Sequence, residues 1–272
     1  MVKTKVVVLL SGGLDSATVA ARALADGCEV IALSFNYGQR NSQELGAARL
    51  IAAHFGIDEH FIVNVDLSAW GGSLLTGGQA ESEAVPPSGR SNTNYVPGRN
   101  TVFIALALSL AEAKGAEAIH LGFTAADRRY PDTGLAYLDA FGRLLNMAGR
   151  STAALRLVAP LIDDNKASIV QQALDHGVPI ALTWSCYAEG AQPCGACVAC
   201  TIRDRALILT GRADLATAAG RQMHAEEADA VSKLLWRFML RDAISTGRPI
   251  DRSGPENSDE RAERSRAHDV GR

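Results

Sequence analysis

Apolar and polar positions alternate in blocks along much of the chain, and the blocks have two different periods. Short runs rich in valine, isoleucine and leucine, which are typical of buried strands, occupy residues 6–10, 30–35, 60–65 and 118–122. Residues 158–160 indicate a fifth strand. Longer segments with apolar residues at helical spacing, which predict helices, occupy residues 16–24, 43–55 and 100–114.

This order of strands and helices predicts an α/β protein with a doubly wound parallel sheet, similar to Rossmann folds. Ligands of such sheets bind beyond the carboxyl ends of the strands. We therefore expect the chemical groups in the loops at that edge, which are residues 11–16, 35–40, 94–100, 122–134 and 183–200.

Other segments lack the strand and helix pattern of this domain. Residues 71–94 are rich in glycine, serine, proline and glutamate, which predicts a long mobile loop or lid. Residues 214–247 are predicted to be helical, with an apolar packing stripe formed by Val231, Leu234, Leu235, Phe238 and Met239. Residues 251–272 are charged and predict a disordered tail. The expected organisation is an α/β domain at 1–182, a metal-binding segment at 183–212, a helical extension at 213–250 and the tail.

Composition narrows the class of protein. The chain has 272 residues, of which 47% are hydrophobic and 6% aromatic, as in an ordinary globular protein. A net charge of −3 gives no electrostatic reason to expect a nucleic-acid partner. No apolar run has the length of a membrane span, and the N-terminus lacks a signal peptide. We therefore expect a cytoplasmic enzyme whose cysteines are reduced.

The loop after the first strand is the most informative segment. Residues 10–16 read Leu-Ser-Gly-Gly-Leu-Asp-Ser between an apolar run and a helical segment. A glycine-rich turn that leads into a helix N-terminus is an anion site, because backbone N–H groups and the helix dipole favour negative charge. Ser11 and Ser16 add hydroxyl donors, and Asp15 is placed to hold Mg²⁺ or to orient the loop. Neither the Walker pattern nor G-x-G-x-x-G is present.

Four of the five cysteines are clustered. Cys194, Cys197 and Cys200 form a Cys-x₂-Cys-x₂-Cys run, and Cys186 precedes it. Four thiolates suit tetrahedral Zn²⁺, and a site with four protein ligands is structural because no position is open. An iron–sulfur cluster is the alternative occupant. Cys28 lies in an apolar run and is expected in the core.

The loop at residues 10–16 resembles that of the N-type ATP pyrophosphatases, which use ATP to activate a carboxyl or carbonyl carbon. Five further segments, in order, resemble the 7-cyano-7-deazaguanine (preQ0) synthase family of queuosine biosynthesis. They are the residues after the second strand (34–40), Tyr-Val-Pro-Gly-Arg-Asn-Thr (95–101), Tyr-Pro-Asp (130–132), Ala-Pro-Leu-Ile-Asp with Lys166 (159–166) and Thr-Trp-Ser-Cys-Tyr (183–187). The resemblance covers about residues 5–212 and implies the fold of adenine nucleotide alpha hydrolases with a C-terminal four-cysteine zinc subdomain.

The resemblance also implies a reaction. ATP would activate the carboxylate of 7-carboxy-7-deazaguanine, free ammonia would form an amide, and a second activation would dehydrate the amide to the nitrile. The implied catalytic residues are Asp15, Arg99 and Lys166, with Mg²⁺ neutralising phosphate charge. The implied ATP-binding stretch is Leu10, Ser11, Gly12, Gly13, Leu14, Asp15, Ser16, Ala17, Thr18, Val19 and Ala20. The implied substrate contacts are Tyr37, Gln39, Arg99, Asp127, Tyr130 and Asp132, and the implied zinc ligands are Cys186, Cys194, Cys197 and Cys200.

Several of these residues have a simpler interpretation. Arg99 could pair with a surface carboxylate, and Lys166 could lie on a solvated helix face. Asp132 and Asn100 could cap helices.

Two departures from the family pattern bear on function. The loop at residues 124–134 is one residue shorter than usual and carries Arg128 and Arg129. The chain also continues past residue 212. The altered loop favours, as an alternative, a paralogue that activates another carboxylate or uses another amine. A nucleotide sensor and a tRNA-thiolating relative are further alternatives, and a homodimer is the expected assembly.

Overall fold

The computed structural model describes residues 3–39, 43–76, 95–227 and 229–230. The chain divides into two compact units, Met1–Thr217 and Ala218–Arg272. In the second unit, residues 218–227 are helical. The predicted apolar stripe at 231–239, the predicted tail and residues 77–94 of the predicted loop lie outside the described residues. The boundaries expected after residues 182 and 212 stay predictions.

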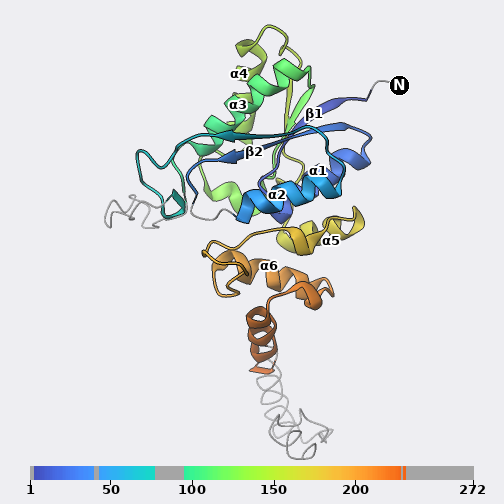
Figure 1. The fold of residues 1–272 in the computed structure, drawn as a ribbon, viewed down its shortest axis with the longest axis vertical. Helices are drawn as coiled ribbons and strands as arrows, with labels where there is room; N and C mark the ends of the chain where they lie inside the picture. The colour runs from blue at the N-terminus through green and yellow to red at the C-terminus, as the bar shows by residue number, and fades with distance from the viewer. Residues whose placement is uncertain (1–2, 40–42, 77–94, 228, 231–272) are drawn as a thin grey trace, which may run out of the picture. The chain divides into compact units, whose positions relative to one another are not determined.

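The strands of the first unit form one parallel sheet. They are β1 (Lys5–Leu9), β2 (Glu29–Asn36), β3 (His60–Asn64), β4 (Ala118–His120) and β5 (Arg156–Val158). Their order across the sheet is β3-β2-β1-β4-β5, and every neighbouring pair is parallel (Figure 1). The order reverses between β1 and β4, which confirms the doubly wound sheet and places a ligand crevice beyond the carboxyl ends of these two strands.

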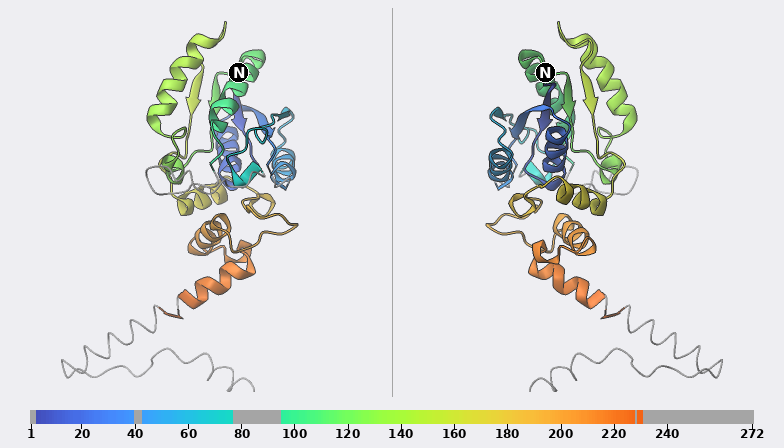
Figure 2. Two further views of the ribbon diagram at one scale, coloured as in Figure 1. Left: turned by 90° about the vertical axis from the view of Figure 1, so that its left-hand side faces the viewer. Right: turned by 90° about the vertical axis from the view of Figure 1, so that its right-hand side faces the viewer.

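Helices cover both faces of the sheet because the central strands are apolar on both sides. Val6 and Val8 of β1 belong to one buried cluster, and Val7 belongs to the other. The first cluster includes buried residues of α1 (Leu14–Ala25), α2 (Gln43–His54), α5 (Lys166–Asp175) and α6 (Val198–Leu209). The second includes α3 (Arg99–Lys114) and α4 (Leu135–Ala148). In Figure 2 the blue helices and the yellow-green α4 lie on opposite sides of the strands.

The observed elements differ from the predicted ones at the fifth strand and at three helices that were not predicted, α4, α5 and α6. The fifth strand lies at Arg156–Val158, two residues before the apolar run that indicated it. Helix α4 buries Phe141 and Leu145 at helical spacing, while Leu144 and Met147 on its other side are exposed.

Among the helices in the described part of the chain, none combines the length and the apolar character needed to cross a bilayer.

Candidate active site and metal centre

The turn from β1 into α1 depends on two glycines. Gly12 has a φ of +88°, and a Cβ there would lie 2.2 Å from the Glu44 carbonyl oxygen. Both the backbone conformation and the lack of space therefore require glycine. Gly13 is the N-cap residue of α1 and offers no capping side chain. The backbone N–H groups of the first turn are therefore left for a ligand.

Two hydroxyls brace this turn. The Ser11 and Ser16 Oγ atoms lie 3.0 Å apart, and the Ser16 hydroxyl donates to the Gly13 carbonyl oxygen at 3.1 Å. The Ser11 backbone N–H donates to the Ser16 Oγ at 3.1 Å. These bonds fix the loop in an open conformation, in which Ser11, Gly13, Asp15 and Ser16 line a cavity.

This cavity has a volume of about 370 Å³ and lies at the carboxyl ends of the strands. The loops expected to carry the chemistry converge there, although they are far apart in sequence. The predicted site residues in its lining are Ser11, Gly13, Leu14, Asp15, Ser16, Tyr37, Arg99, Asp127, Tyr130, Asp132 and Lys166. Other predicted residues lie behind the lining: Leu10, Gly12, Gln39, Ala17, Thr18, Val19 and Ala20.

Those other residues have local structural contacts. Leu10, Ala17, Val19 and Ala20 are fully buried. The Thr18 hydroxyl donates to the Leu14 carbonyl oxygen at 2.8 Å. Gln39 closes a turn, accepting from the Tyr37 N–H at 2.7 Å and donating to the Phe35 carbonyl oxygen at 3.1 Å. A role of these residues in binding stays a prediction.

Lys166 and Asp15 form an ion pair at the mouth of the turn. The Lys166 Nζ donates to both carboxylate oxygens of Asp15, at 2.6 and 2.7 Å. Lys166 is the first residue of α5, and its side chain lines the cavity. The structure thus brings together two predicted site residues that are 151 positions apart.

A second group of polar side chains surrounds Arg99. Its guanidinium carbon lies 5.6 Å from the centre of the Tyr37 ring, and its Nη1 donates to the Tyr37 hydroxyl at 3.4 Å. Burial raises the pKa of Tyr37, and the charge of Arg99 opposes this. Burial also raises the pKa of Glu44 to about 7, although the charge of Arg99 acts to lower it. Arg99 therefore lies in the cavity near Tyr37 and Glu44, and no salt bridge of Arg99 is seen among the described residues.

The loop at residues 124–134 is ordered by its own side chains. The Asp127 carboxylate accepts from the Thr124 N–H at 2.9 Å and from its hydroxyl at 2.8 Å, which forms a capping box. Arg128 pairs with Asp163. Arg129 lies 5.0 Å from the centre of the Tyr130 ring and lines the cavity. The two arginines that depart from the family pattern thus differ, because only Arg129 reaches the cavity lining.

Asp132 is the most unusual group in the lining. Its side chain is buried, and within the described part of the chain neither carboxylate oxygen has a hydrogen-bond partner. It does not cap α4, whose N-cap residue is Gly134. Asn100 is likewise no N-cap, because α3 starts at Arg99 after Gly98. A buried carboxylate without partners is costly, which points to a ligand that donates hydrogen bonds to it.

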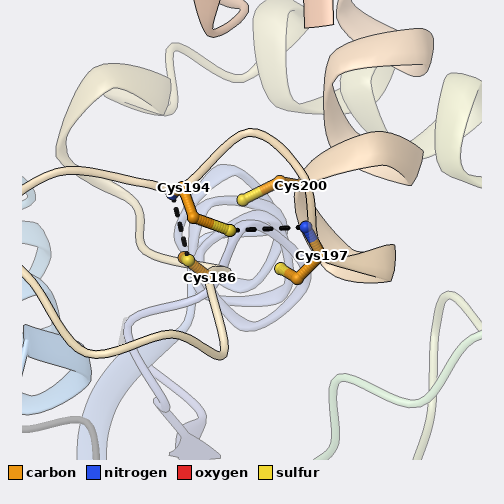
Figure 3. A group of neighbouring side chains, drawn as sticks. All are labelled: Cys186, Cys194, Cys197 and Cys200. Carbon is orange, nitrogen blue, oxygen red and sulfur yellow. Dashed lines mark hydrogen bonds between the residues drawn. The ribbon is translucent and has the colours of Figure 1, made fainter. Parts of the chain in front are cut away.

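Four cysteines come together beside this cavity. The sulfur atoms of Cys186, Cys194, Cys197 and Cys200 all lie within 4.8 Å of one another (Figure 3). Four sulfurs about 2.3 Å from a tetrahedral metal would be roughly 3.8 Å apart, so the group fits a metal ion. Cys197 is the N-cap residue of α6, and Cys200 lies in its first turn.

Backbone N–H groups donate hydrogen bonds to sulfur atoms of this cluster. The Cys194 N–H donates to the Cys186 sulfur at 3.3 Å, and the Cys197 N–H donates to the Cys194 sulfur at 3.3 Å. Donors from Ala196 and Cys197 lower the pKa of Cys194 to about 6. This lowered pKa favours the thiolate of Cys194, which is the form that binds metal, whereas burial raises the pKa of Cys186 and Cys200.

Many lining residues were not predicted as site residues, and three of them carry polar or charged side chains that bear on the site. Glu44 is in the first turn of α2, Trp184 follows a short turn, and Arg203 lies on α6. The sequence offered a signal only for Trp184, which belongs to one of the motifs. Glu44 and Arg203 look like solvated helix charges until the helices are packed.

A parallel sheet whose first strand-to-helix loop lines a cavity with an Asp–Lys pair defines a nucleotide-binding α/β protein. Comparison with known proteins specifies the family. A sequence profile described as "Queuosine biosynthesis protein QueC" matches residues 5–211. The chain belongs to this family.

Two relatives described as 7-cyano-7-deazaguanine synthases agree with the family. A 7-cyano-7-deazaguanine synthase of Synechococcus elongatus is 56% identical over 227 residues, which is 80% of this chain and 97% of the relative. One of Gloeothece citriformis is 53% identical over 231 residues, which is 82% of this chain and 99% of the relative. A solved NMN synthetase structure from Francisella tularensis covers 81% of both chains at 18% identity, with a TM-score of 0.44.

Proposed function

We propose that this chain is an ATP-dependent ligase that converts 7-carboxy-7-deazaguanine and ammonia to 7-cyano-7-deazaguanine in queuosine biosynthesis. The observation that carries the proposal is one cavity that combines an anion-binding turn with the unpartnered Asp132 carboxylate. The first suits the phosphates of ATP, and the second suits the N–H-rich edge of a guanine-like base. The high identity to synthases over nearly their whole length supports the same activity.

The phosphates bind at the first turn of α1. Backbone N–H groups and the Ser11 and Ser16 hydroxyls donate to phosphate oxygens. Mg²⁺, held by Asp15, would neutralise phosphate charge and polarise the phosphorus. With Asp15 occupied in this way, the Lys166 ammonium turns to the phosphates and stabilises the charge that develops on them.

The base binds at the other end of the cavity. A 7-deazaguanine presents a ring N–H and an amino group on one edge, and the two oxygens of Asp132 accept both. Tyr130 offers an aromatic face to the ring. This arrangement directs the carboxylate of the base toward the ATP phosphates.

Two rounds of the same chemistry give the nitrile. A carboxylate oxygen attacks a phosphorus of ATP, and pyrophosphate or ADP leaves from that phosphorus. Ammonia then displaces the phosphorus-bound oxygen from carbon, and an amide remains with loss of one proton. The amide oxygen is activated in the same way and leaves with phosphorus as the nitrogen loses its remaining protons. Both oxygens of the carboxylate depart on phosphorus, so each nitrile consumes two ATP. Arg99 is placed to stabilise the oxyanion charge in both rounds.

The four cysteines complete the proposal. We assign Zn²⁺ to them, since soft thiolates in a four-ligand set suit a closed structural zinc site. The enzyme is expected to be a cytoplasmic homodimer that acts on small molecules, without nucleic-acid or membrane partners.

The direct test incubates the purified protein with ATP, Mg²⁺, ¹⁵N-ammonium and 7-carboxy-7-deazaguanine and follows the base by mass spectrometry. We expect the labelled amide first and then the labelled nitrile. Nucleotide binding without conversion of this base would contradict the proposal and favour a paralogue with another carboxylate. Metal analysis of the same preparation should give one zinc per chain, and iron would contradict that assignment.

A further inference from the structure

A short segment of backbone connects the cysteine cluster to the phosphate-binding turn. It begins at the 3₁₀ turn Ile180–Leu182 and runs through Thr183 and Trp184 to Cys186. The segment has no strand partner or helix to hold it after residue 182. Its conformation is set instead by hydrogen bonds to two neighbouring parts of the first unit.

On one side, the segment bonds to the phosphate-binding turn. The Trp184 N–H donates to the Gly12 carbonyl oxygen at 2.9 Å. A Cβ added at Gly13 would meet the Trp184 carbonyl oxygen at 3.5 Å, so the two backbones lie in contact. Gly12 is already pressed against Glu44 on its other side. The turn is therefore held between α2 and this segment.

On the other side, the segment bonds to α6 through Arg203. The guanidinium donates from Nη1 to the Thr183 carbonyl oxygen and from Nη2 to the Ile180 carbonyl oxygen, both at 2.8 Å. Arg203 is three residues after Cys200, which places it one helical turn beyond the cluster. The indole Nε1 of Trp184 adds a bond to the Cys186 carbonyl oxygen at 3.0 Å.

We propose that Arg203 is a positioning residue that couples metal binding at the four cysteines to ATP binding at the turn formed by residues 11–16. A metal that joins Cys186 to Cys200 fixes the start of α6 against the segment. Arg203 then holds the Thr183 carbonyl in place, and the adjoining Trp184 N–H holds Gly12. The inference rests on the proposed use of ATP.

Coupling of this kind is reciprocal. If the metal strengthens nucleotide binding by some factor, the nucleotide strengthens metal binding by the same factor. A residue that only stabilises the fold would change both affinities without changing this factor. The coupling factor between metal binding and nucleotide binding is therefore the measurement that distinguishes a positioning residue from one that only stabilises the fold.

The test uses the full-length, zinc-loaded protein, with α,β-methylene-ATP as the nucleotide. Binding of the analogue is measured by calorimetry with and without the metal. Equilibrium transfer of zinc to a chromogenic chelator is measured with and without the analogue. Arg203→Ala and Arg203→Lys are compared with Arg205→Ala, which changes an exposed arginine on the same helix.

We expect Arg203→Ala to weaken analogue binding about tenfold or more and to bring the coupling factor close to one. The ATP KM should rise similarly while kcat at saturating ATP stays within about threefold. Lysine can donate to one carbonyl but lacks the planar fork, so Arg203→Lys should give intermediate values. Methylguanidinium should partly restore analogue binding to Arg203→Ala, and Arg205→Ala should match the wild type.

A wild-type coupling factor in either Arg203 variant would overturn the inference, even if binding is weaker overall. Should the alanine variant fail to fold, the lysine variant decides the question alone. A wild-type protein that binds no analogue would overturn the proposed function itself, and a wild type that binds it equally with and without metal would overturn only the coupling.

Discussion

At the scale of single residues, the lining of the cavity contains groups that are kept there at a cost in stability. Asp132 has two buried carboxylate oxygens without partners in the described chain, and Glu44 is held where its charged form is disfavoured. Such groups are common at functional sites, because a bound ligand can supply the hydrogen bonds or the charge that the protein itself does not provide. Each of them gives a measurable prediction.

Asp132→Asn should separate stability from function. The change removes an uncompensated buried charge, so the free energy of unfolding should rise by about 1–2 kcal/mol. The amide can no longer accept both N–H groups of the base, so the KM for the deazaguanine should rise about 100-fold while the ATP KM changes little. Asp139→Asn, an exposed partner of Arg143 on α4, is the matched control. Unchanged affinity for the base in Asp132→Asn would contradict the assigned contact.

Glu44 should make stability depend on pH. Its pKa is about 7 in the folded chain and near 4.5 when unfolded, so the folded state binds more protons between these values. The contribution of Glu44 to the free energy of unfolding should therefore be largest below pH 4.5. This contribution should fall as the pH rises to about 7. We expect wild type to lose about 3 kcal/mol more than Glu44→Gln across that interval, measured by urea titrations. Parallel pH profiles for the two proteins would contradict this.

At the scale of elements, the site depends on how closely α2 approaches the turn between β1 and α1. The carbonyl of Glu44 and the N–H of Ala48 occupy the space that a side chain at residue 12 would need. The turn that is proposed to bind phosphate is thus shaped by its contact with α2. The Lys166–Asp15 pair is likewise made by two helix starts, those of α1 and α5.

Gly12→Ala should disrupt this packing. A positive φ disfavours alanine by about 1–2 kcal/mol, and the contact with α2 adds to that cost. We expect a loss of about 2–4 kcal/mol in the free energy of unfolding and loss of nucleotide binding, measured by urea titration and calorimetry. Gly46→Ala in α2 is the control, because a Cβ there meets no atom within 4 Å. It should stabilise the protein by about 0.5–1 kcal/mol, and a similar loss in both variants would contradict the argument.

At the scale of the whole molecule, the first unit contains the sheet, the cavity and the cysteine cluster. The family profile ends at residue 211, within this unit. The matches to the two synthases cover 97% and 99% of the relatives' own length. They leave about a fifth of this chain unmatched. The second unit is therefore an addition to a complete family fold.

Truncation after Thr217 should preserve the reaction. We expect kcat/KM for the deazaguanine within about threefold of the full chain and the same zinc content, because among the described residues none of the cavity lining lies beyond Arg203. Steady-state kinetics and metal analysis check this. A folded, zinc-loaded truncation without activity would show that the second unit takes part in catalysis.

The amino-acid sequence by itself determined the sheet class, the glycine-rich turn after the first strand and the cysteine cluster. Each depends on residues close together in the chain, since strand and helix periods, glycine torsions and metal-ligand spacing are local properties. Helix α4 was not predicted although Phe141 and Leu145 lie at helical spacing, so this local pattern was also present in the sequence.

Only the tertiary structure decided which distant side chains meet. Lys166 reaches Asp15 across 151 positions because β1 is central in the sheet and α5 packs beside α1. The same packing left the Asp132 carboxylate without a hydrogen-bond partner among the described residues and placed Glu44 near Arg99. It also directed Arg203 at two backbone carbonyls rather than at solvent. Burial and long-range pairing arise from strand order and helix packing, which no short motif contains.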